Sequence, residues 1–194
     1  MPQVWDMDYE DGYVYTTQPN GTDPSKVYMI DVADPENPFV EYTITSDMNQ
    51  TAVKASEGYA YVVEYFYVTY PGTWPLNDHS ALRIFDVSDP SGPVEVGSCE
   101  FDGTGEKYQF LGIDVDSTYA YVILRERASG EYRLKLFDIT NKNTPQELTG
   151  GNGGEYIFPA LTQDVSVEGD YVYVAVEDST TPDRNNRRRN SSHY

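Results

Sequence analysis

Short alternating runs of apolar and polar residues, separated by turn residues, cover most of the chain. The clearest of them end in a Tyr-x-Tyr strand after a tight turn, as in "KASEGYAYVVEY" and "QDVSVEGDYVYVAVED". Alternating β-branched and aromatic residues around "EDG", "SEG", "DST" and "EGD" turns are typical of antiparallel hairpins. No segment keeps a helical period with capping residues, so the pattern predicts an all-β chain with few helices.

The hairpins are parts of a repeated unit. The four Tyr-x-Tyr segments begin at Val4, Thr51, Leu111 and Thr162. Between them an apolar strand ends in Asp, followed by a short turn, with Pro in or just after it, and another strand-like segment. This second pattern occurs three times, at Asp31, Asp86 and Asp138, with spacings of 55 and 52 residues. Each full unit therefore predicts four short antiparallel strands.

The strand "LRIFDV" is apolar on both faces, because Leu82 and Ile84 point one way and Phe85 and Val87 the other. Such a strand must be buried on both sides. A four-stranded sheet between similar sheets meets that need, which is the geometry of a β-propeller blade. A β-sandwich would also bury the strand, but it would not need a repeating sequence.

The segments "LRIFDVSDPSGPVEVGS", "GYAYVVEY" and "QDVSVEGDYVYVAVED" resemble the LVIVD repeat, a propeller-type repeat common in exported and cell-surface proteins of bacteria and archaea. YVTN and other surface-layer-type repeats share the Tyr-x-Tyr-Val hairpin and the Asp-Val turn. The resemblance covers residues 3 to 179, approximately. It implies a β-propeller and an extracellular or cell-surface location in a prokaryote, and it carries over no catalytic residues.

The repeat divides the chain into blades at about residues 3–46, 50–101 and 110–149, with a partial blade at 160–179. This makes about three and a half blades, whereas a closed propeller takes at least about four. Three explanations stay open. The chain is a fragment of a longer propeller, it pairs with another copy into a ring of about seven blades, or it stacks open-ended into a filament.

The composition is strongly acidic, with 32 acidic and 13 basic residues and a net charge of −19. This charge argues against binding of nucleic acid or anionic membrane through the body of the chain. The single Cys99 excludes an internal disulfide. The opening "MPQVWDMDYEDG" does not resemble a signal peptide, and no apolar run reaches the roughly 18 residues of a membrane helix. We therefore expect a soluble chain without membrane insertion, whose export signal is removed or lies outside it.

Residues 180–194 form the only basic patch, with four Arg and one Asp. Their sequence has no strand pattern, which favours a disordered end or a scar of sequence processing. A sharper hypothesis is that Arg187, Arg188 and Arg189 dock on the acidic body of a neighbouring copy, which would favour assembly at low salt.

Two DxD pairs offer hard oxygen ligands for calcium, the one cofactor that the sequence suggests. They are Asp6 with Asp8 and Asp114 with Asp116. Alternation along a strand produces such pairs without any function, and neither fits the spacing of an EF-hand loop, so a solvated face is the favoured interpretation. Alignment on the Tyr-x-Tyr motif makes four residues equivalent, namely Asp8, Lys54, Asp114 and Ser166.

The largest irregular insertion spans residues 64–81, within the second unit. Its aromatic side chains could bind sugars or another subunit; the candidate binding residues are Tyr67, Tyr70, Trp74 and His79. The alternative interpretation is a longer hairpin in which Tyr is an ordinary strand former. Three triplets match the N-glycosylation pattern, at Asn20, Asn49 and Asn190.

No catalytic motif stands out. The two histidines, His79 and His193, have no Ser or Cys partner at a recognisable spacing, and the glycine-rich "TGGNGGEY" lacks the Lys of a phosphate loop. The sequence therefore predicts a non-enzymatic structural or adhesion module on or outside a prokaryotic cell, whose partners are other copies of itself or the missing part of a longer chain. The alternative is a lectin-like propeller that binds glycans through residues 64–81.

Overall fold

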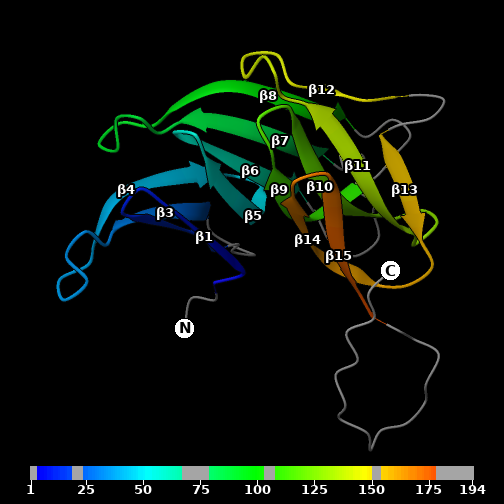
Figure 1. The fold of residues 1–194 in the computed structure, drawn as a ribbon, viewed down its shortest axis with the longest axis horizontal. Coiled ribbons are helices and arrows are strands. Elements are labelled where there is room, and N and C mark those ends of the chain that lie inside the picture. The colour runs from blue at the N-terminus through cyan, green and yellow to red at the C-terminus, as the bar shows by residue number, and fades with distance from the viewer. Residues whose placement is uncertain (1–3, 19–23, 67–78, 103–107, 150–153, 178–194) are drawn as a thin grey trace, which may run out of the picture.

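The computed structural model of the chain describes residues 4–18, 24–66, 79–102, 108–149 and 154–177. Every regular element in these ranges is a β-strand, which confirms the predicted all-β fold. Within the same ranges there is no helix that could cross a membrane. Figure 1 shows the strands gathered into sheets that follow one another around an open arc, from the blue N-terminal sheet to the orange C-terminal hairpin.

The first two sheets have four antiparallel strands each, in sequence order. Sheet one consists of β1 (Asp6–Glu10), β2 (Tyr13–Gln18), β3 (Ser25–Asp31) and β4 (Phe39–Ser46). Sheet two consists of β5 (Asn49–Ser56), β6 (Tyr59–Phe66), β7 (His79–Asp86) and β8 (Val94–Asp102). Each sheet is one blade of the predicted kind.

The third sheet and the C-terminal hairpin complete the series. Sheet three consists of β9 (Tyr108–Val115), β10 (Tyr119–Glu126), β11 (Tyr132–Asp138), β12 (Gln146–Glu147) and β13 (Glu155–Phe158). The hairpin consists of β14 (Thr162–Glu168) and β15 (Tyr171–Val176). The first strands of the four sheets, β1, β5, β9 and β14, pack against one another in that order, and we call them the inner strands. Three blades and a half blade arranged in this way confirm the propeller-like array.

The outer strand of the third blade is divided, which the sequence pattern did not indicate. β12 pairs with β11 at Phe137 and Asp138, and β13 pairs with the other half of β11. Leu148 follows β12 and Gly154 precedes β13, and the two lie so close together that a Cβ at Gly154 would lie 2.2 Å from the carbonyl oxygen of Leu148. Gly154 also has a φ of +111°, so only glycine fits this close approach.

The aspartate that ends the third strand of each blade has a structural role. Asp31, Asp86 and Asp138 each accept the N–H two residues further on, at 2.8, 2.9 and 2.9 Å. This Asx turn redirects the chain out of the sheet without leaving a donor unpaired. The hydroxyls and N–H groups that bond these carboxylates hold the pKa of Asp86 and of Asp138 below its usual range. The repeated Asp therefore forms the turn after the third strand in each of the three full blades.

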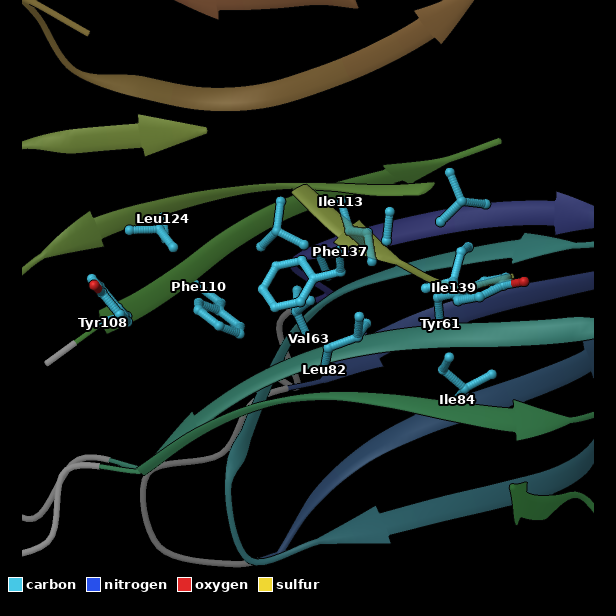
Figure 2. Packing of buried hydrophobic residues seen from close by; sticks show 14 residues of the cluster. Tyr61, Val63, Leu82, Ile84, Tyr108, Phe110, Ile113, Leu124, Phe137 and Ile139 are labelled. Carbon is cyan, nitrogen blue, oxygen red and sulfur yellow. The ribbon is translucent and has the colours of Figure 1, made fainter. Parts of the chain in front are cut away.

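The hydrophobic core lies between blades. Leu82 and Ile84 pack toward the third sheet, in a cluster with Phe110 and Phe137 (Figure 2). Phe85, on the other face of the same strand, packs toward the first sheet with residues such as Tyr15 and Val27. The two-faced strand "LRIFDV" is thus buried on both sides, as its sequence predicted.

A substitution of Phe110 can test how much the core between the second and third blades stabilises the fold. Its side chain is fully buried, and its ring lies 5.6 Å from that of Phe101 and 6.4 Å from that of Phe137, centroid to centroid. We expect Phe110→Ala to lower the free energy of unfolding by about 3 to 5 kcal/mol, measured by urea denaturation. The matched control is Phe39→Ala, at a position that is 54% exposed, which should change it by less than about 0.5 kcal/mol. Equal effects of the two changes would contradict a core between blades.

Candidate functional site

The carboxylates of β1 bind the backbone of the next blade. Asp6 Oδ2 accepts the N–H of Val53 at 3.0 Å, and Asp8 Oδ2 accepts the N–H of Ala55 at 2.8 Å. In an antiparallel pair the N–H groups of alternate residues point away from the partner strand, so β5 cannot satisfy these two through β6. Residues two apart on β1 point to the same face, which gives the carboxylates the matching spacing.

Glu10 extends this ladder to the tip of the next hairpin. Its carboxylate accepts the N–H of Glu57 at 2.5 Å and the N–H of Gly58 at 3.3 Å. Both residues have positive φ values, +56° and +77°, as the tight turn requires. The acidic D-x-D-x-E pattern of β1 therefore joins the first blade to the inner strand and turn of the second.

The same contact recurs between the third blade and the half blade. Asp114 Oδ2 accepts the N–H of Val167 on β14 at 2.6 Å, while its Oδ1 accepts the N–H of its own neighbour Val115 at 2.9 Å. The hairpin registers place Asp8, Lys54, Asp114 and Ser166 opposite the equivalent tyrosines of their own blades, which confirms the alignment made from the sequence.

Lys54 takes the place of a carboxylate in the second blade. Its Nζ lies 3.5 Å from Asp8 Oδ2 and 3.3 Å from Asp114 Oδ1, so one cation joins acidic groups of the first and third blades. Burial opposes the charge on Lys54, but Asp114 and Asp8 outweigh it and raise the pKa of the ammonium group. The equivalent positions thus form an acid–base–acid row across three inner strands.

The other predicted calcium ligands have separate environments. Asp116 caps its own hairpin, since it accepts the N–H groups of Thr118 and Tyr119, both at 2.7 Å, and the Tyr121 hydroxyl at 2.9 Å. Burial raises the pKa of Asp6, with a smaller contribution from the like charge of Asp164. In the ranges that the structure describes, no group of three or more acidic, His or Cys side chains is arranged to hold a metal ion. Calcium binding stays a prediction.

The predicted glycan-binding and glycosylation residues are only partly within the described chain. His79 begins β7, and its Nε2 lies 3.7 Å from Glu100 Oε2. Asn49 begins β5 and is half-buried. The remaining residues of these predictions lie outside the residues that the structure describes; they are Tyr67, Tyr70, Trp74, Asn20 and Asn190. The lectin-like alternative therefore stays a prediction.

The Tyr-x-Tyr motif supplies the packing surface between blades. Tyr15 and Tyr61 are equivalent in hairpin register, and they are only 2% and 1% exposed because each lies under the following blade. Tyr173 is their counterpart on the half blade and is 55% exposed, and Tyr171 beside it is 69% exposed. The β14–β15 hairpin thus presents the surface that two other blades bury.

The first blade presents the opposite surface. Val53 and Ala55 on β5 are 2% and 5% exposed because they face the first blade, whereas their register counterparts Met7 and Tyr9 on β1 are both 61% exposed. We call the uncovered side of β1 the leading face and that of β14–β15 the trailing face. Sequence reasoning identified the half blade but not these two faces. The Tyr-x-Tyr strands of a propeller are buried by neighbouring blades, so the alignment of the four motifs would have indicated that the first and the last blade each have an uncovered side.

Comparison with protein families supports the repeat. The model of the LVIVD repeat matches residues 78–100, which include β7 and most of β8, and residues 161–180, which include β14 and β15. These matches confirm the resemblance found in the sequence. No curated protein matches the chain.

Lys54 offers a test of the acid–base–acid row. We expect Lys54→Met to lower the free energy of unfolding by about 1 kcal/mol at pH 7, because Asp8 and Asp114 lose their shared cation. The pKa of Lys54 is raised in the folded state, so its contribution is fully present below the ordinary Lys value of 10.5 and is lost as the pH rises through the folded value.

The measurement is urea denaturation followed by circular dichroism at pH 7 and at a pH well above 10.5, where the difference from the wild type should disappear. Lys26→Met, on the outward side of the first blade's β3, is the control and should have little effect at either pH. A Lys54→Met variant as stable as the wild type at pH 7 would show that the row contributes nothing to cohesion.

Proposed function

Since the chain carries LVIVD repeats in a propeller-like fold, we propose that it is a non-enzymatic structural or adhesion module, located outside or on the surface of a prokaryotic cell. It acts through contacts between blades. The leading and trailing faces bind further blades, and this association completes or extends the propeller. The resemblance to repeats of exported proteins and the net charge of −19 support the location.

The observation that carries the proposal is the contrast among equivalent tyrosines. Tyr15 and Tyr61 are buried between blades, and Tyr173 is 55% exposed on the trailing face. An uncovered patch of this kind on a soluble protein usually marks an interaction site. The acidic residues of the inner strands support a structural role as well, because Asp6, Asp8 and Glu10 serve as acceptors for backbone N–H groups of the next blade.

The strength of such an association can be bounded. Burying Met7, Tyr9, Tyr171 and Tyr173 would contribute roughly 1.5 to 3 kcal/mol for each side chain. Association itself costs on the order of 4 to 15 kcal/mol in lost freedom of motion. The two quantities are similar in size, so association should depend on concentration and should be sought at micromolar levels and above.

The test is the mass in solution, measured by size-exclusion chromatography with light scattering over a range of concentrations. We expect a multiple of the 21.9 kDa chain mass at high concentration, and a shift toward the single chain on dilution. The variant Tyr171→Ser/Tyr173→Ser should stay at the single-chain mass, because it removes the apolar part of the trailing face.

The matched control is Tyr156→Ser, which changes a tyrosine that is 59% exposed on β13, a strand of the third blade that belongs to neither face. It should associate like the wild type. A wild-type chain that keeps the single-chain mass at all concentrations would refute association through these faces.

A further inference from the structure

Resting on this proposed function, we infer that the partner is a second copy of the chain and that the contact has one polarity. The trailing face of one copy docks on the leading face of the next, and Glu168 accepts the N–H groups of the Asp11–Gly12 turn. The inference follows from residues that occupy the same register in different blades of the chain.

The trailing face repeats the acceptors of the first blade. Glu168 lies opposite Tyr171 in its hairpin, as Glu10 lies opposite Tyr13. Two and four residues earlier, Ser166 and Asp164 occupy the positions of Asp8 and Asp6. All three side chains of the half blade are exposed. The half blade therefore has two carboxylates and a hydroxyl at the positions where the first blade has the three carboxylates that bind the second blade.

The leading face repeats the donors of the second blade. The Asp11–Gly12 turn has φ values of +47° and +87°, close to the +56° and +77° of the Glu57–Gly58 turn that Glu10 binds. The two turns close hairpins of the same register. The N–H of Asp11 is thus oriented for a carboxylate in the place of Glu10, which on the trailing face is Glu168. The N–H of Gly12 donates to the Tyr9 hydroxyl at 3.3 Å, and Glu168 would replace that exposed acceptor.

Asp164 provides a second contact of the same type. Its Oδ1 accepts the N–H of Val165 at 2.9 Å, in the way that Asp114 accepts from its own neighbour. Asp114 shows that such a carboxylate also reaches the next blade, since its Oδ2 accepts the N–H of Val167 at 2.6 Å. In the docked pair the corresponding donor for Asp164 is the N–H of Met7.

The apolar parts of the two faces match as well. Within the chain, Tyr15 packs in one cluster with Val53 and Ala55 of the following blade. The counterpart of Tyr15 on the trailing face is Tyr173, and the counterparts of Val53 and Ala55 on the leading face are Met7 and Tyr9. Tyr173 of one copy would therefore cover Met7 and Tyr9 of the next.

This polarity sets the type of assembly. The two faces differ, so the contact is heterologous and leads either to a closed ring or to a filament.

The test uses two variants, each defective in one face. Glu168→Lys places a cation that cannot accept a hydrogen bond on the trailing face, and Tyr9→Asp places a carboxylate on the leading face. We expect each alone to lose association by about tenfold or more. Glu36→Lys, an equal charge change in the exposed β3–β4 turn, should associate like the wild type.

Mixing the two variants distinguishes the polarity. The intact trailing face of Tyr9→Asp should dock on the intact leading face of Glu168→Lys, giving a 1:1 pair of twice 21.9 kDa and nothing larger. Formation of this pair also shows that both variants fold. If the wild type and Glu36→Lys associate but the mixture does not, or if one variant alone dimerises like the wild type, the head-to-tail contact is refuted while association through blades stands. A wild type that stays a single chain refutes both.

Discussion

The inner strands of the second blade and of the half blade carry N–H groups that their own sheets do not bind, and carboxylates of the preceding blade accept them. For β5 the acceptors are Asp6, Asp8 and Glu10, and for β14 the acceptor is Asp114. An unpaired backbone donor in a partly buried strand costs free energy comparable to a lost hydrogen bond. A blade is therefore complete only beside a neighbour, and the tyrosine surfaces that pack between blades have the same requirement.

Positions at which the preceding blade offers no carboxylate show that the inner-strand N–H groups still need an acceptor. Lys54 stands where a carboxylate would accept from Val115, and the N–H of Val115 bonds instead to the carboxylate of Asp114 on its own strand. Gly112 has no side chain at the next such position, and the N–H of Val165 likewise turns to the aspartate before it. Gly112 also allows β9 and β14 to pack closely, since a Cβ at this position would lie 3.0 Å from the carbonyl oxygen of Gln163. Each donor is satisfied locally where the neighbouring blade offers no acceptor.

Much of the fold could be predicted from repetition and alternation. The hairpins, the turn aspartates such as Asp86 and the two buried faces of "LRIFDV" follow from local chemistry and period, which act within a few residues. The divided outer strand of the third blade did not follow, because Gly154 permits a close approach to Leu148 that only the folded chain brings about. The D-x-D pairs were interpreted as a solvated face or as calcium ligands, because their acceptor role depends on donors 47 residues away in another blade.

Hydrogen–deuterium exchange at single-residue resolution, on dilute and concentrated samples, tests most directly whether neighbouring blades satisfy the inner strands. The amides of Glu57 and Gly58 should be protected at every concentration, because Glu10 of the same chain bonds them. The amide of Asp11 should exchange fast in the dilute sample and become protected in the concentrated one. Fast exchange of Glu57 and Gly58, or unchanged exchange of Asp11 in a sample whose mass shows association, would contradict the account that neighbouring blades satisfy these N–H groups.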